Sequence, residues 1–484
     1  MTELLVWPIV TPLVAALLVL LWPSRAASLG IAAAVLTLLS TFAVVWEVSR
    51  DGVLELALGG WSPGLGIALR ADGLSAVLLV MSGLVSLAVA IYASVYFAGS
   101  AQRAGFWTLW LLLLTALHAL FLSGDLFNVY VTLELMGLAA VVMAALGGGR
   151  EALQAALRYL ILGLLGSLAF LAGVAMVYAG FGTLDMAALA GVVTPVPVAW
   201  VALTLMTGGL LIKAALFPLH IWLPAAHANA PAPVSAMLSA LVVKAALYLV
   251  VRLWLELFDG VVTPAAAWVI GVPAGIAVIW GSWAALRAAR LKLLAAYSTL
   301  AQLGYLFLFI ALAATLPAGE SRATVMTALV LMAISHGFAK SAFFLGAGVV
   351  MQQAGHDRIA DLGGTARALP LTTFTLALAG VALVGLPPSG GFIAKWQLLT
   401  TAITSGQWIW LPVVGLGTLL AAAYLFRLLG HAFAPGEGVG PRLAVVREEI
   451  PALVLALTAT LLLGLGAAGL WELVPLSAYA GRGV

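Results

Sequence analysis

The lysines of this chain have an unusual setting. Four of the five lie inside or beside long apolar runs: Lys213, Lys244, Lys340 and Lys395. A lysine at the centre of a bilayer costs roughly 2.5–3.5 kcal/mol, so four without partners or water would cost on the order of 10–14 kcal/mol. Ionisable residues at such depth are typical of a path for protons or ions, and Glu134 and His336 share this setting.

The chemistry open to these groups is proton transfer. Burial in an apolar medium lowers the pKa of a lysine and a nearby carboxylate raises it, so a lysine whose carboxylate partner moves becomes a proton switch. Glu134, in NVYVTLELMGLAA, is the only acidic residue predicted deep inside an apolar span, and Lys213 is its natural partner. A static ion pair that fixes helix packing is the alternative. One glutamate cannot neutralise four lysines, which favours the proton path.

The histidines fall into three settings. His336 and Lys340, in ISHGFAKSAFF, are four residues apart on one helical face, which fits a relay step; a histidine bonded to a carbonyl is the alternative. His220 and His227 flank a predicted helix break in FPLHIWLPAAHANAP, where a relay and a structural or solvating role fit equally. No further ligands cluster there, so no metal is expected. His118 is expected to be a packed helix residue.

The composition is that of a polytopic helical membrane protein. Of 484 residues, 64% are hydrophobic and 8% charged, and the mean hydropathy is +1.17. A net charge of +3 without a long basic run excludes nucleic acid as a partner. The absence of cysteine excludes thiolate metal sites, iron–sulfur clusters and c-type haem, and no cofactor is expected. The first apolar run has no basic region before it and predicts a retained span.

Runs of about 20 apolar residues predict fourteen spans. They lie near 3–22, 28–49, 73–95, 106–121, 126–146, 155–180, 198–217, 231–256, 262–286, 291–315, 324–350, 371–402, 407–430 and 450–473. The seventh is broken at Pro218 and Pro224, and the twelfth at Pro387 in GLPPSGG, just before Lys395. Irregular backbone at membrane depth survives only where it is buried or lines a hydrated cavity, and it marks the site in transporters built from repeats.

The two breaks are five spans apart, which predicts two inverted five-helix units. The expected divisions are 1–103 for helices 1–3, 104–260 for the first unit, 261–431 for the second and 432–484 for the last helix. With both termini on the non-cytoplasmic side, the positive-inside rule is satisfied by twelve basic residues against five. The smaller group comprises Arg50, Arg70, Arg252, Arg322 and Arg482.

Several motifs, in order, resemble one known family. They are KAALFPLHIWLPAAHANAPAPVSAMLSALVVKAALYLVVR, LKLLAAYSTLAQLGY, SHGFAKSAFFLGAG and GLPPSGGFIAKW. The resemblance covers spans four to thirteen and is to the antiporter-like subunits of Mrp-type cation/proton antiporters, membrane-bound hydrogenases and respiratory complex I. It implies fourteen helices, two inverted five-helix units and interrupted helices seven and twelve. It also implies proton-translocating roles on five helices, for Glu134, Lys213, Lys244, His336 with Lys340, and Lys395.

The expected function is therefore proton translocation within a multi-subunit complex of a prokaryotic inner membrane, without catalytic bond chemistry of its own. The chain has a length similar to that of the Mrp D-type subunit, which would exchange sodium or potassium for protons. The sequence around His220, in contrast, resembles hydrogenase and complex I relatives. A haem-bearing electron carrier would need paired axial histidines, which six scattered histidines supply poorly. A passive scaffold would explain the hydrophobicity but not the lysines.

Overall fold

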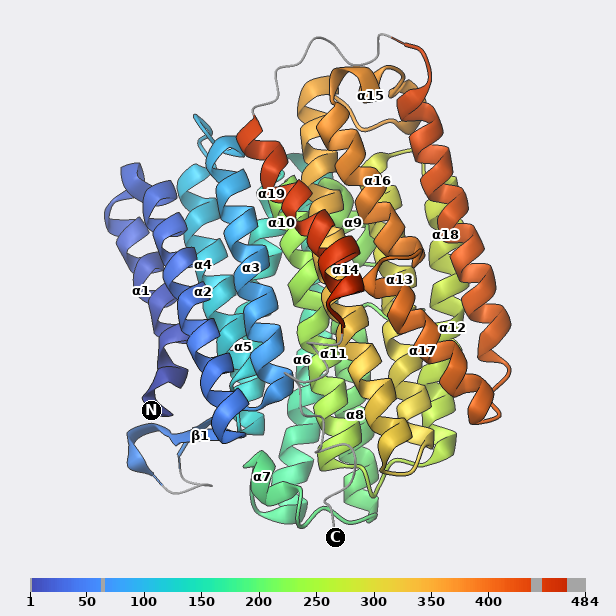
Figure 1. Cartoon of the computed structure of the whole chain (residues 1–484). Coiled ribbons are helices and arrows are strands. Elements are labelled where there is room, and N and C mark those ends of the chain that lie inside the picture. Colours follow the sequence, from blue (N-terminus) through green and yellow to red (C-terminus); the bar gives the residue numbers. More distant parts are fainter. Residues whose placement is uncertain (1, 62–65, 437–445, 468–484) are drawn as a thin grey trace.

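The computed structural model describes residues 2–61, 66–436 and 446–467, which form a bundle of near-parallel helices (Figure 1). At one side of the bundle lie α1 (Trp7–Leu21), α2 (Ala26–Asp51), α3 (Gly73–Tyr96) and α4 (Arg103–Phe121). The chain continues through α5 (Leu126–Ala145), α6 (Gly149–Phe181), α7 (Met186–Leu189), α8 (Pro197–Lys213), α9 (Leu223–Asn229), α10 (Ala232–Met237) and α11 (Val243–Arg252).

The second half contains the longest helix and the second break. Its elements are α12 (Pro264–Arg287), α13 (Leu291–Thr315), α14 (Glu320–Ala354), α15 (Thr365–Ala368), α16 (Pro370–Val384), α17 (Gly390–Thr404), α18 (Trp410–Phe433), α19 (Val446–Leu457) and α20 (Leu463–Leu465). Helix α19 packs across α3, α14 and α16, and so joins the two halves of the bundle (Figure 1).

All fourteen predicted spans coincide with helices, apart from 468–473, which lie outside the described residues. In the described part of the chain, 12 helices are long and apolar enough to cross a membrane. The two shorter apolar helices, Pro197–Lys213 and Pro370–Val384, belong to the spans expected to be interrupted. The predicted fold class, an all-α polytopic membrane protein with broken helices, is confirmed. The division into two inverted units stays a prediction.

Both breaks come directly after a short helix. Helix α8 stops at Lys213, and Ala215 follows with a φ of 53°, a left-handed conformation that residues with a Cβ rarely adopt. Helix α16 stops at Val384, and Gly385 has a φ of 81°. The expectation that Pro224 breaks the helix is wrong, because it lies in the first turn of α9, where proline's missing N–H costs nothing.

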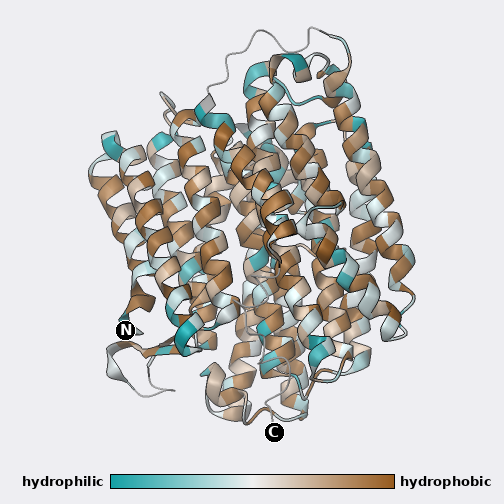
Figure 2. Ribbon diagram, in the orientation of Figure 1, coloured by the Kyte–Doolittle hydropathy of each residue, from teal (hydrophilic) through white to brown (hydrophobic). Residues whose placement is uncertain are grey.

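The centre of the bundle is formed by α13, α14 and the α10–α11 span, each of which carries a buried lysine. In the most apolar windows of α14 and of the α10–α11 span every residue is buried, and in α13 89% are, whereas the value for α2 or α6 is 33%. Hydrophobic residues dominate the visible outer helices (Figure 2). The polar groups are thus surrounded by protein, and the lipid-facing surface is apolar.

Two local features were not expected. An antiparallel pair of strands, β1 (Leu54–Ala57) and β2 (Ala68–Ala71), joins α2 to α3, with Leu54 opposite Ala71. Short π-helical turns occur at Leu238–Val242, Leu253–Leu257 and Thr458–Leu462, the first two within the span that carries Lys244. Such turns often accompany functional sites, and apolar patterning does not reveal them.

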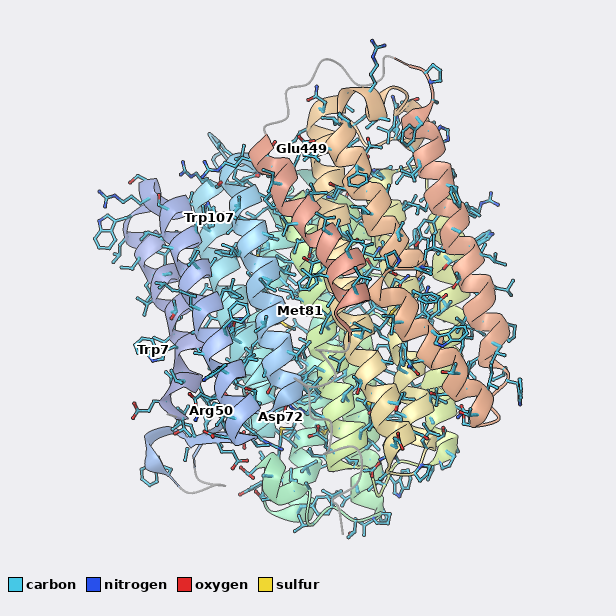
Figure 3. All side chains as sticks on the ribbon, in the orientation of Figure 1. Trp7, Arg50, Asp72, Met81, Trp107 and Glu449 are labelled. Carbon is cyan, nitrogen blue, oxygen red and sulfur yellow. The ribbon has the colours of Figure 1, made fainter. Side chains whose placement is uncertain are left out.

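Charged side chains gather at the two ends of the bundle. Arg50 and Asp72 lie at one end and Glu449 toward the other (Figure 3). At the end with Asp72, Arg252 Nη2 is 2.6 Å from Asp72 Oδ1. At the other end, Arg427 donates to the carbonyls of Leu286 and Ala288. Arg50 and Arg252, from the smaller predicted group of basic residues, thus lie at one end of the bundle, and Arg427, from the larger group, lies at the other. Which end faces the cytoplasm stays a prediction.

Candidate functional site

The predicted partners Glu134 on α5 and Lys213 on α8 form an ion pair, with 3.2 Å between Lys213 Nζ and Glu134 Oε1. Ser167 Oγ on α6 also donates to Glu134 Oε1. Lys213 is the last residue of α8, so its ammonium sits at the negative end of the helix dipole and beside the break. The pair borders a small cavity together with Gly137 and Tyr159. The pair therefore lies directly before the first break.

Lys244 is held by a carbonyl and not by a carboxylate. It lies on α11 with 1% of its surface exposed, and its Nζ donates to the Ser239 carbonyl in the preceding π turn at 2.6 Å. Ser239 Oγ in turn lies 2.9 Å from Thr299 Oγ1 on α13. Among the residues that the structure describes, Lys213 is the one lysine in an ion pair. The charge of Lys244 is therefore stabilised by a carbonyl dipole and not by an opposite charge.

His336 and Lys340 lie one turn apart in the buried centre of α14. Lys340 Nζ donates to the Ala295 carbonyl at 2.8 Å and to Ser298 Oγ, both on α13. The two ring nitrogens of His336 have no hydrogen-bond partner among the described protein atoms. The alternative of a histidine fixed by a carbonyl therefore finds no support here. Buried polar atoms in native proteins are nearly always paired, with water where protein offers nothing.

Lys395 on α17 caps the helix that precedes its break. Its Nζ donates to the Val384 carbonyl at 2.9 Å and approaches the Leu383 carbonyl at 3.5 Å, both at the C-terminal end of α16. It also lies 4.1 Å from the centroid of the Tyr305 ring. The ammonium groups of Lys213 and Lys395 thus both lie at the C-terminal end of a short helix, α8 and α16 respectively, just before a break.

The remaining sequence candidates lie around the first break, except Pro387. Pro218 and His220 lie in the break, where His220 stacks on Phe217 with 5.3 Å between ring centroids. His227 lies on α9, is fully buried, and has no hydrogen-bond partner for either ring nitrogen among the described residues. It lies within electrostatic range of three lysines: Lys244, Lys292 and Lys340. Pro387 lies in the second break.

His118 has a packing role away from these groups. It joins three helices: its Nδ1 lies 2.9 Å from the Pro8 carbonyl and its Nε2 lies 2.6 Å from Ser82 Oγ. The prediction that His118 is a packed helix residue is confirmed. In the described ranges, no group of three or more histidine, cysteine, aspartate or glutamate side chains could hold a metal ion.

Four buried polar residues were missed. Lys292 was not among the four lysines singled out in the sequence, yet only 2% of it is exposed. Gln302 Nε2 donates at 2.7 Å to the Leu383 carbonyl that Lys395 also approaches. Glu448 and Glu449 at the start of α19 are buried, and Thr372 Oγ1 donates to Glu449 at 2.7 Å. These two glutamates are more deeply buried than Glu134, which is half-buried. Lys292 and the two glutamates flank apolar runs, and a sequence pattern does not say what protein covers such flanks.

The fold and these buried groups define the class: a polytopic helical membrane protein with two interrupted helices and ionisable side chains through its core. The chain belongs to the NADH:quinone oxidoreductase/Mrp antiporter transmembrane family, whose model matches residues 123–421. The predicted superfamily is thereby confirmed, and the match spans most of the region in which the motifs were found.

Relatives in the family carry two kinds of name. The N subunit of the NADH-quinone oxidoreductase of Desulforudis audaxviator is 36% identical over 425 residues, covering 84% of this chain and 82% of that protein. The D subunit of the Na(+)/H(+) antiporter of Bacillus subtilis is 27% identical over 454 residues, covering 91% and 89%. A chain in the structure of the Mrp complex from Dietzia sp. DQ12-45-1b superposes with a TM-score of 0.89 at 26% identity, covering 99% of this chain and 98% of that one.

Proposed function

We propose that this chain is the proton-translocating, antiporter-like subunit of a multi-subunit membrane complex. The observation that carries the proposal is the set of buried lysines on α8, α11, α14 and α17, three of which are held by carbonyls. A carbonyl stabilises an ammonium less than a carboxylate does, so each lysine can release its proton to water and take up another.

The proposed path runs from Lys213 to Lys395 in steps that move only protons. Lys213 would release a proton when Glu134 moves away, and water would pass it to Lys244. His336 or Lys340 would take the next position, and Lys395 at the second break the last. The unpartnered ring nitrogens of His336 support a hydrated connection at that point.

Two host complexes fit the relatives. The length and coverage of the match to the Bacillus antiporter protein support an Mrp-type antiporter, in which proton movement is coupled to sodium or potassium. The higher identity to the Desulforudis oxidoreductase protein supports a membrane arm of the complex I type, driven by electron transfer. Purification of the tagged chain with its native partners distinguishes them: antiporter subunits identify the first, and quinone-reductase or hydrogenase subunits the second.

The Glu134→Gln variant tests the proposed function. Glutamine keeps the shape and the hydrogen bond with Ser167 but removes the charge that pairs with Lys213. Proton transport by everted vesicles, followed with a pH-sensitive dye at equal complex abundance, is expected to fall by at least tenfold. Activity above about half of the wild-type value would exclude a gating role for the pair. Ser24→Ala, in the exposed turn between α1 and α2, is the control expected to leave transport unchanged.

A further inference from the structure

Two neighbouring hydroxyls on α13 have no part in the path described so far. Ser298 and Thr299 belong to the motif LKLLAAYSTLAQLGY, and 1% and 0% of their surfaces are exposed. Both donate to the Ala295 carbonyl one turn earlier in the helix, Ser298 Oγ at 2.9 Å and Thr299 Oγ1 at 3.0 Å. Serine and threonine in a helix often make such a bond, which satisfies the hydroxyl within its own helix. Thr299 differs because its oxygen also contacts a second helix.

The Ala295 carbonyl has more donors than it can accept. Besides the two hydroxyls of α13, Lys340 Nζ on α14 donates to it at 2.8 Å. A carbonyl oxygen has two lone pairs, so three side-chain donors compete for them. A charged ammonium makes roughly twice as strong a hydrogen bond as a neutral hydroxyl does. Protonation of Lys340 therefore weakens the bond from Thr299 to this carbonyl, while Ser298 stays beside the ammonium as a second acceptor.

The second contact of Thr299 is with the turn that holds Lys244. Thr299 Oγ1 lies 2.9 Å from Ser239 Oγ, and Ser239 is fully buried in the π turn before α11. In that turn the N–H of Val243 donates to the Leu238 carbonyl, five residues back. The Ser239 carbonyl is thereby available to Lys244 Nζ, which donates to it at 2.6 Å. The hydroxyl pair therefore fixes the acceptor of Lys244 to the helix that carries the acceptor of Lys340.

The hydroxyl of Thr299 has one hydrogen and two acceptors within reach, the Ala295 carbonyl and Ser239 Oγ. When Lys340 is neutral, Thr299 can donate to Ala295 and accept from Ser239. When Lys340 is charged and takes the Ala295 carbonyl, the hydrogen of Thr299 turns to Ser239 Oγ. The bond between the two hydroxyls is kept in both orientations, so the π turn stays fixed to α13 while the direction of that bond follows the charge of Lys340.

We propose that Thr299 is a positioning residue for proton transfer between Lys244 and Lys340. Its hydroxyl holds the carbonyl acceptors of the two lysines in a fixed relation and links the hydrogen bonding of one site to the charge of the other. The inference rests on the proposed function. No covalent bond of Thr299 breaks, because its hydrogen only rotates between two acceptors. The transported proton passes through water from one amine to the other, as in the proposed path.

Two substitutions of Thr299 separate its hydroxyl from its volume. Thr299→Val keeps the shape without the hydroxyl, and Thr299→Ser keeps the hydroxyl without the methyl group. At equal amounts of assembled complex, Thr299→Val is expected to lower the initial rate of proton transport about fivefold, and Thr299→Ser to retain at least about half of it. A role in packing alone predicts the reverse order, because serine leaves a gap and valine does not. Thr204→Val, at an exposed threonine of α8 that donates to the Trp200 carbonyl one turn back, is the control expected to transport normally.

The partner hydroxyl gives the second test. Ser239→Ala breaks the same bond from the other side and is also expected to slow transport about fivefold. The double variant Thr299→Val/Ser239→Ala should be no slower than Thr299→Val, because both changes remove one interaction. Normal transport by an assembled Thr299→Val complex, a slower rate for Thr299→Ser than for Thr299→Val, or losses that multiply in the double variant would overturn the role of Thr299 and leave the proposed function in place. Wild-type vesicles without proton transport would overturn both.

Discussion

Substitution of Lys244 separates a proton carrier from a fixed charge. Its Nζ has one described protein acceptor, the Ser239 carbonyl at 2.6 Å, and the side chain is buried in α11. Lys244→Ala removes the proton site. Lys244→Arg keeps a positive charge in the same place but cannot release its proton at any usable pH.

The size of the expected effect follows from that hydrogen bond. A hydrogen bond to a charged group contributes about 1.5–3 kcal/mol. If a proton passing through this position loses that stabilisation, the rate falls by about 10- to 150-fold, since each 1.36 kcal/mol is a factor of ten. The fold itself should tolerate Lys244→Ala, because removing a charge without a carboxylate partner from the interior also removes the free-energy cost of desolvating it.

Initial rates of proton uptake in vesicles, normalised to the amount of assembled complex, measure the effect. Both variants are expected to show the loss, with Lys244→Arg no better than about a tenth of the wild-type rate. Normal transport by Lys244→Arg would mean that the charge at this position matters and proton release does not. Normal transport by Lys244→Ala would remove Lys244 from the path altogether.

Three further outcomes are expected. Gln302→Leu leaves the Leu383 carbonyl to Lys395 alone, and the stronger hydrogen bond to the ammonium should slow proton transport about fivefold. Gln302→His should retain most of the wild-type transport rate. Equal rates for the two variants would exclude a role for the amide. His118→Ala removes two hydrogen bonds that join α1, α3 and α4, and it should lower the stability of the purified chain by about 2–4 kcal/mol. Transport per assembled complex should not change. Thermal unfolding in detergent measures the first effect and vesicle assays the second. Burial alone would raise the pKa of the Asp72 carboxyl, but the charge and hydrogen bond of Arg252 outweigh burial and hold that pKa well below its usual range. The pairing therefore stabilises the fold fully when the pH is above about 4, the pKa of this carboxyl in the unfolded chain. The stabilisation decreases progressively as the pH falls through and below that value. Asp72→Asn should accordingly lower the unfolding temperature at pH 7 more than at pH 2, and an equal loss at both would contradict the assignment.

Hydropathy predicted the spans because lipid exposure and burial both require apolar residues over a fixed length. The pairing of Glu134 with Lys213 was also predictable, since a buried acid needs a cation and the lysine stood beside a break. Carbonyl partners such as Ser239 for Lys244 or Ala295 for Lys340 were not, because the acceptor is backbone and any residue supplies one. The burial of Lys292 depends on how α9 and α10 bend over the start of α13, which leaves no mark in the sequence pattern of α13 itself.

The most direct test of a single proton path is a cycle of Lys213→Ala, Lys395→Ala and the double variant. The two lysines lie at the two helix breaks, and steps in one series path do not combine additively. The measurement is the initial rate of proton transport by each assembled complex across a range of pH. The wild type is expected to transport protons, each single variant to lose most of the rate, and the double variant to be no worse than either. Single variants that transport normally, or partial losses that multiply in the double variant, would contradict one continuous path through the buried lysines.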